Sequence, residues 1–93
     1  MNRAFEWDED KADRNLRKHG VSFAEGSTVF ADPLSLTIPD PLHSADEERF
    51  VTLGLSYRER LVVVAYAERG ERVRIISARP ATSRERKDYE ELG

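Results

Sequence analysis

The sequence predicts a small α+β domain in which helices pack on an antiparallel β-sheet. Three observations support this prediction: helix-capping signals in the first third of the chain, a run of β-rich segments after it, and one more capping signal near the end. A chain of 93 residues with an apolar fraction of 39% has room for one hydrophobic core. We therefore expect one domain over residues 1–93.

A short edge strand is predicted over Arg3–Trp7, followed by a helix. Alternation along the strand places Phe5 and Trp7 on the same face. Asp8 is a suitable N-cap for the helix, and Gly20 ends it after a basic last turn. These signals together predict one complete helix between them.

A second helix is predicted to start after Ser22 and to run to about Phe30. Ser22 and Glu25 have the spacing of a capping box, in which the hydroxyl and the carboxylate each accept a hydrogen bond from the other residue's backbone N–H. A short strand over Leu34–Ile38 follows, and the proline-rich segment 39–46 predicts an exposed loop.

The second half of the chain predicts consecutive antiparallel strands over Arg49–Tyr57, Arg60–Glu68 and Glu71–Ala78. Arg69-Gly70 is the two-residue turn between the last two strands. The segment Leu61–Tyr66 is apolar on both faces, which predicts a central strand with helices over at least one side.

A last helix is predicted through about Leu92, because Thr82 and Glu85 repeat the capping-box spacing. The predicted fold class is therefore α+β. We expect a small antiparallel sheet built on a central three-to-four-strand meander, with two N-terminal helices and one C-terminal helix.

Composition excludes several classes of protein. The chain has no cysteine, which excludes disulfides, thiolate metal sites and cysteine nucleophiles. No apolar run approaches the roughly 18 residues of a membrane-spanning helix, and the first residues form neither a secretory nor a transit signal. We expect a soluble protein of the cytoplasm that has no membrane partner.

Charge is distributed unevenly along the chain. Residues 1–57 contain 6 basic and 11 acidic residues, whereas residues 58–87 contain 9 basic and 4 acidic residues. Such asymmetry suggests an anionic partner for the basic segment, although the formal net charge is −3. A solvated face whose arginines pair with local glutamates is an equally good interpretation.

Arginines of the last predicted strand are candidates for a functional site. Period two places Arg72 and Arg74 on one face, and Arg79 follows near the strand end, where Pro80 releases the chain from the ladder. Guanidinium groups donate paired hydrogen bonds to phosphates and keep their charge, so the pattern suggests a phosphodiester clamp. The alternative is ion pairing at the sheet surface with nearby glutamates, namely Glu68, Glu71 and Glu85.

Neither of the two histidines has a partner spaced for a zinc site, so we expect no metal. His19 fits a cation at a helix C-terminus or a packing residue. His43 lies in the proline-rich loop, where an imidazole can take a proton near pH 7 or remain an idle surface group. Glu48 and Arg49 start a strand, and one of them is placed to face a cleft beside the arginine-bearing strand.

A series of short motifs runs along nearly the whole chain. They are Phe5–Asp8, Asn15–Phe23, Val29–Pro33, Asp40–Ser44, Glu47–Phe50, Arg74–Arg79 and Glu85–Tyr89. Taken together, in this order, they resemble the BrnT family of bacterial toxins.

This resemblance implies a RelE-like ribonuclease fold and a toxin that cleaves RNA without metal or cofactor and so inhibits translation. It also implies neutralisation by a BrnA-like antitoxin whose ribbon-helix-helix domain binds operator DNA, so that the toxin reaches DNA only through its antitoxin. In RelE-like enzymes the RNA's own 2'-hydroxyl attacks the phosphate, leaving a 2',3'-cyclic phosphate and a 5'-hydroxyl. Such chemistry depends on stabilisation of negative charge, which arginines supply.

Carried over by position, the resemblance assigns roles to individual residues. Arg74 and Arg79 are expected to bind the scissile phosphate, and Glu48 or His43 to take the 2'-hydroxyl proton. The residues expected to contact RNA elsewhere are Arg72, Lys18, His19 and Arg49.

Two other functions fit the same residues. The first is a binding module without catalysis, whose basic face holds RNA or an acidic partner. The second is an inactive family member kept as a partner-binding or co-repressor subunit, because binding an antitoxin requires a surface and no active site. The acidic N-terminal half is also readable as a docking surface for a basic antitoxin segment.

Overall fold

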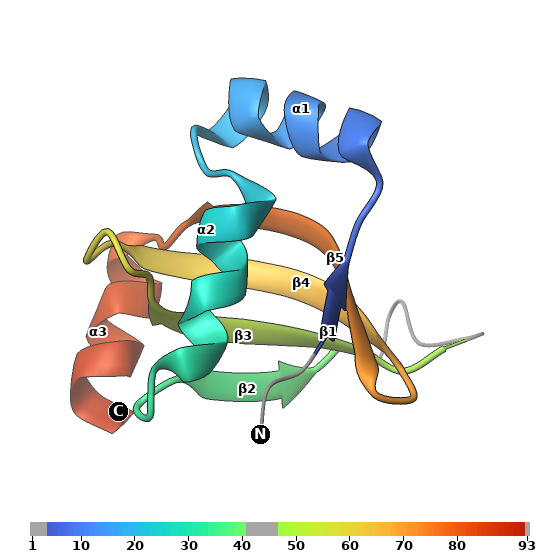
Figure 1. The fold of residues 1–93 in the computed structure, drawn as a ribbon. Coiled ribbons are helices and arrows are strands. Elements are labelled where there is room, and N and C mark those ends of the chain that lie inside the picture. Colours follow the sequence, from blue (N-terminus) through green and yellow to red (C-terminus); the bar gives the residue numbers. More distant parts are fainter. Residues whose placement is uncertain (1–3, 41–46, 93) are drawn as a thin grey trace.

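The computed structural model describes residues 4–40 and 47–92 (Figure 1). Its elements are β1 (Ala4–Glu6), α1 (Glu9–His19), α2 (Phe23–Ser27), the 3₁₀ helix η1 (Thr28–Ala31), β2 (Leu36–Pro39), β3 (Arg49–Leu55), β4 (Leu61–Arg69), β5 (Arg72–Pro80) and α3 (Ser83–Leu92). In the part of the chain that the structure describes, no helix is long and apolar enough to cross a membrane.

The five strands form one mixed sheet in the order β1-β5-β4-β3-β2. The strands β2 to β5 pair antiparallel in chain order, whereas β1 pairs parallel with β5. The four strands β2 to β5 match the predicted meander, but the prediction of an antiparallel sheet was wrong for the edge strand β1, which makes the sheet mixed. The partner of β1 lies more than sixty residues away in sequence, so no local pattern reveals it.

The second predicted helix is divided. Its α-helical part ends at Ser27, and the chain continues as the 3₁₀ helix η1 to Ala31. Gly26 lies where this helix meets the sheet, and a Cβ atom at that position would stand 3.1 Å from the Cβ of Ala78. The close approach brings the backbone of α2 down onto β5.

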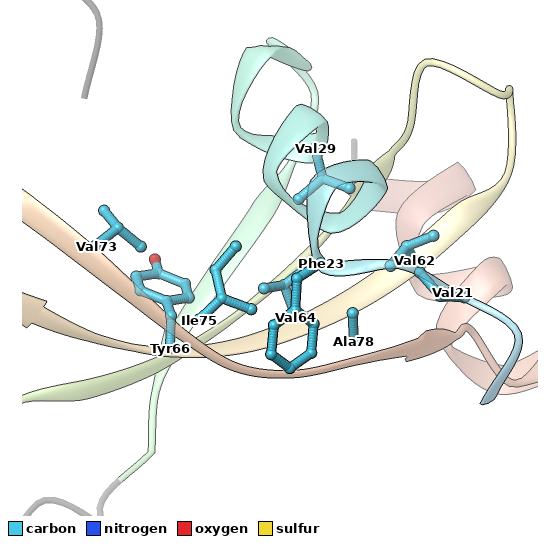
Figure 2. Close-up of a cluster of buried hydrophobic side chains, with 9 residues drawn as sticks. All are labelled: Val21, Phe23, Val29, Val62, Val64, Tyr66, Val73, Ile75 and Ala78. Carbon is cyan, nitrogen blue, oxygen red and sulfur yellow. The ribbon is translucent and has the colours of Figure 1, made fainter. Parts of the chain in front are cut away.

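The main core lies between the α2–η1 segment and one face of the sheet (Figure 2), and Ala12 of α1 packs against it. Its buried members are Val21, Phe23, Val29, Val62, Val64, Tyr66, Val73, Ile75 and Ala78. A smaller cluster of Leu53, Leu61 and Val63 lies on the opposite face, where Ala81 and Tyr89 pack against it. The helix α3 covers only that end of the second face, and no other helix formed by residues 4–40 and 47–92 lies over the rest of it (Figure 1).

A β-bulge in β5 decides which side chains share the second face. Tyr66 pairs with Ile75 and Ala65 pairs with Ser77, so Ile76 is an extra residue in the strand. The insertion reverses the alternation beyond it. As a result Arg79 lies on the same face as Arg74, where unbroken alternation would have sent it to the opposite face.

The end of β5 also differs from the prediction. The strand was expected to stop at Ala78, with Pro80 releasing the chain. It runs instead through Pro80, which pairs with Val62. The preceding turn is shifted as well: Arg69 is the last residue of β4, and the turn consists of Gly70 and Glu71.

Candidate functional site

A row of side chains crosses the uncovered part of the second sheet face. In register, Glu6 of β1 is next to Arg74 of β5, Arg74 is next to Ala67 of β4, and Ala67 is next to Arg49 of β3. In the adjoining row Arg72 pairs with Arg69. We call this surface the open face and define it by Glu6, Arg49, Arg69, Arg72 and Arg74.

A shallow depression lies beside the arginines of the open face, one row away from Ala67. Ala67, between Arg49 and Arg74, is fully buried, because neighbouring side chains close over it. In the next row Ala65 pairs with Ser77, and a depression of about 190 Å³ opens there. The residues lining the depression are Asp40, Arg49, Phe50, Ala65, Tyr66, Ile76 and Ser77.

Glu6 is in contact with three arginines of the open face. Its carboxylate accepts hydrogen bonds from Nη1 of Arg72 at 3.3 Å and from Nη1 of Arg74 at 3.2 Å, and it lies 3.8 Å from Nη1 of Arg69. The hydrogen bond from Arg72 is the largest influence on the pKa of Glu6, and together with Arg74 it lowers that pKa although burial opposes the change. Glu6 is therefore ionised throughout the physiological range.

A second carboxylate joins the other side of the cluster. Glu47, just before β3, lies 3.2 Å from Nε of Arg69 and 3.5 Å from Nη2 of Arg49. With Asp40 beside Arg49 in the depression, the four arginines face three carboxylates, and the surface keeps a formal excess of one positive charge.

Arg79 has a different environment at the other end of β5. Its two terminal nitrogens donate to the two carboxylate oxygens of Glu85 in α3, at 2.8 and 2.9 Å. This hydrogen bonding, mainly from Arg79, lowers the pKa of Glu85 to about 2. Arg74 and Arg79 are five positions apart on one strand, about 16 Å at the usual rise per residue, so they do not surround a single phosphate. The alternative that an arginine pairs with Glu85 is confirmed for Arg79.

The other sequence-predicted residues are placed as follows. Lys18 and His19 lie at the end of α1, which packs on the main-core side: Asn15 of α1 donates to the backbone carbonyl of Ala78 at 2.7 Å. The structure does not bring them to the open face. Glu48 is exposed just before β3, and its carbonyl accepts the N–H of Glu68. His43 lies outside the described residues.

Sequence reasoning did not single out Glu6, Arg69 or Glu47 as site residues. Alternation in β1 separates Glu6 from Phe5 and Trp7, which was a usable signal that its side chain faces away from the core. Arg69 was assigned to a turn, and its place on the open face follows from its inclusion in β4. Within residues 4–40 and 47–92, no group of three or more His, Cys, Asp or Glu side chains could hold a metal ion.

Comparisons with known proteins agree with the motif series. A crystal structure of the Brucella abortus ribonuclease toxin BrnT, at 1.1 Å resolution, is similar over 88% of this chain and 100% of that chain, with a TM-score of 0.69 and 25% sequence identity. Comparison with curated proteins gave no match. The family model described as the ribonuclease toxin BrnT of type II toxin–antitoxin systems matches residues 7–85. This match extends over most of the sequence, and the chain therefore belongs to the BrnT family of ribonuclease toxins.

Proposed function

We propose that this chain is a toxin that binds RNA across the open face and cleaves it without a metal ion. The observation that carries the proposal is the alignment of Arg49, Arg69, Arg72 and Arg74 on a part of the sheet that none of the described helices covers. Clustered arginines on one face are the electrostatic requirement for binding a phosphate backbone. The family's description as ribonuclease toxins supplies the reaction class.

The reaction we propose is transesterification within the RNA. The 2'-oxygen forms a bond to the adjacent phosphorus while the bond from phosphorus to the 5'-oxygen breaks. The 2'-hydroxyl proton passes to a base, and the leaving 5'-oxygen takes up a proton. The products are a 2',3'-cyclic phosphate and a 5'-hydroxyl end.

The open face is suited to stabilise this transition state. Arg49 and Arg74 lie on either side of Ala67, with Cα atoms about 10 Å apart at the usual strand spacing, so their long side chains can converge on one phosphate. Their positive charge opposes the negative charge that develops on the phosphoryl oxygens. The depression over Ala65 and Ser77 gives the neighbouring nucleotide a place beside them.

We also propose roles for the other residues that the family resemblance assigned to the site. Arg74 is the main phosphate-binding group, with Arg72 beside it, and Arg79 contacts a phosphate further along the RNA once Glu85 releases it. The proton acceptor is Glu48 or His43. Lys18 and His19 contact RNA or a ribosomal surface outside the open face.

The toxin's partner follows from its family. A type II toxin–antitoxin system pairs the toxin with a protein antitoxin, and we propose a BrnA-like antitoxin with a ribbon-helix-helix domain that alone contacts operator DNA. We propose a RelE-like mode of action on RNA in the cytoplasm. Co-purification with the neighbouring gene product, and its effect on RNA cleavage, test this pairing.

The experiment that tests the activity is incubation of the purified protein with a defined RNA in EDTA, followed by end-group analysis. We expect cyclic-phosphate and 5'-hydroxyl ends from the wild type, and at least tenfold slower cleavage by Arg74→Ala. Arg79→Ala is tested separately, because its guanidinium is held by Glu85. Arg17→Ala, an exposed arginine of α1, is the matched control.

A second function is favoured by one specific observation. Arg72 and Arg74 both contact Glu6, and Arg79 gives both of its terminal nitrogens to Glu85. A face whose arginines already have carboxylate partners also suits a non-catalytic binding or co-repressor subunit. RNA binding without cleavage, in the presence of ribosomes and with the fold intact, would support this function over the ribonuclease.

A further inference from the structure

We infer that Glu6 is a positioning residue whose carboxylate orders Arg72 and Arg74 so that both guanidinium groups meet one RNA phosphate. The inference rests on the proposed function, because it concerns how the same open face holds RNA. It adds a residue from the opposite end of the chain to a site made of strand arginines.

The backbone at Glu6 is held firmly by its two neighbours in sequence. The Phe5 ring lies 5.2 Å from that of Phe30, and the Trp7 ring lies 6.0 Å from that of Phe23, measured between centroids. Both neighbours pack against the main core, so alternation leaves the Glu6 side chain on the open face. The Glu6 carboxylate is thus attached to a well-packed part of the sheet. Only about a quarter of the Glu6 side-chain surface is exposed.

The contacts of Glu6 differ in kind from those of Glu85. Arg72 and Arg74 each offer Glu6 one terminal nitrogen, at 3.3 and 3.2 Å. Arg79 instead gives both terminal nitrogens to Glu85 at shorter distances. A guanidinium has five N–H donors, so a single contact orients the group and leaves donors for a phosphate, whereas the paired contact occupies the edge that would bind one.

The charge state of Glu6 suits a role as a permanent negative partner for the arginines. Its pKa is lowered, first by the hydrogen bond from Arg72. A carboxylate that stays ionised in this way is a weak proton acceptor at neutral pH. It is nevertheless a constant partner for two guanidinium groups that would otherwise repel each other and spread into solvent.

Two roles for Glu6 make opposite predictions. If Glu6 only neutralises the arginines, its removal frees Arg74 to bind phosphate more strongly. If Glu6 orders them, its removal makes Arg74 contribute less. The sign of the energetic coupling between Glu6 and Arg74 therefore distinguishes these roles, and a double-mutant cycle measures it.

The experiment measures binding of a 2'-O-methyl RNA oligonucleotide, which lacks the attacking hydroxyl, at one fixed salt concentration. The proteins are wild type, Glu6→Gln, Arg74→Gln and the double variant. We expect Arg74→Gln to weaken binding about tenfold in the wild type and only about twofold in the Glu6→Gln background. An equal or larger loss in the Glu6→Gln background would overturn the inference.

Two further variants separate ordering from net charge and from folding. Glu71→Gln removes the same charge from an exposed position in the β4–β5 turn, where Glu71 makes no ion pair with another described residue, and it should leave the effect of Arg74→Gln at about tenfold. Glu6→Asp keeps the charge and withdraws the carboxylate by one methylene. We expect Glu6→Asp to weaken binding; unchanged binding by a folded Glu6→Asp protein would argue for neutralisation alone.

Cleavage of ordinary RNA, measured on the same proteins, tests the proposed function separately. If the wild type does not cleave but the coupling has the expected sign, the ribonuclease proposal fails and the role of Glu6 in phosphate binding stands. If the wild type cleaves and the coupling is absent or reversed, the ribonuclease proposal stands and the role of Glu6 fails. With both correct, Glu6→Gln lowers kcat at saturating RNA.

Discussion

The hydroxyl of Tyr89 donates a hydrogen bond of 2.6 Å to the carboxylate of Asp32, and this bond attaches α3 to the loop before β2. Asp32 also accepts the backbone N–H groups of Leu55 at 2.8 Å and Leu34 at 2.9 Å. Burial raises the pKa of Asp32, but these three hydrogen bonds outweigh it, and the pKa is lowered. One carboxylate thereby joins a helix, a loop and the last residue of β3, at the end of the strand opposite to Arg49 and the open face.

We expect Tyr89→Phe to lower the free energy of unfolding by about 1.5 kcal/mol, because the mutant loses one hydrogen bond to a charged acceptor. The hydrogen bond to Asp32 raises the pKa of Tyr89 to about 12. The stability it confers is complete below pH 10 and is lost as the pH rises toward 12. Urea unfolding across this range measures both effects. Tyr57→Phe, at a residue 70% exposed, is the control and should change neither.

Glu85 should make the attachment of α3 sensitive to acid. Its folded-state pKa, lowered to about 2 mainly by the hydrogen bond from Arg79, lies below its ordinary value of 4.5. The stabilisation is therefore present above pH 4.5 and is lost as the pH falls toward 2. Unfolding measured between these limits should show a smaller pH dependence in Glu85→Gln than in the wild type. An unchanged dependence in Glu85→Gln, matching that of Glu91→Gln, would contradict this assignment.

The buried carboxylate of Glu25 should depend on Arg60. Glu25 is 2% exposed; its Oε2 accepts from the Ser56 hydroxyl at 2.7 Å and from Arg60 Nε at 2.9 Å, and its Oε1 contacts Arg60 Nη2. Arg60→Gln leaves the carboxylate without its main charge partner, and we expect a loss of about 3 kcal/mol in the free energy of unfolding.

The double variant Glu25→Gln with Arg60→Gln should recover part of that loss, because no unpaired charge is then left buried. Arg58→Gln is the control. Its guanidinium lies 3.8 Å from Glu25 and is more than half exposed, so its removal should cost less than about 1 kcal/mol. A loss from Arg58→Gln as large as that from Arg60→Gln would mean that net charge, and not the buried contact, stabilises Glu25.

RNA binding at the open face should depend on salt in proportion to the arginines engaged. Arg49→Gln is expected to reduce the slope of log affinity against log salt concentration by about 0.7, the value for one phosphate contact on a single strand. Arg17→Gln on α1 should leave the slope unchanged. Equal reductions from both variants would place the RNA across the whole molecule and not on the open face. Fluorescence anisotropy over a series of salt concentrations provides the measurement.

The helix caps show how much of the structure can be predicted from residues close together in the sequence. Thr82 and Glu85 form the complete capping box that their spacing predicts, with hydrogen bonds of 3.2 Å and 2.8 Å in the two directions. Ser22 likewise accepts the N–H of Glu25 at 2.9 Å. The side chain of Glu25, however, turns inward to Arg60, 35 residues away. A buried ion pair outweighed the local partner, and spacing alone does not reveal that choice.

The candidate site was predicted only in part, for a related reason. Arg72 and Arg74 were correctly placed on one face, since alternation over two residues is local. Alternation failed beyond the bulge at Ile76, which moved Arg79 onto that face, and Arg79 then found Glu85 as its partner.

By itself the sequence determined the family, the α+β class, the helix caps and the basic character of one segment. These depend on residue types and on contacts a few positions apart. The tertiary structure alone decided that β1 pairs with β5 and that Glu6 meets Arg74, 68 residues away. The pairing of the strands, their register and the position of the bulge depend on how all the elements bury their apolar faces together. A short segment of the sequence does not contain that information.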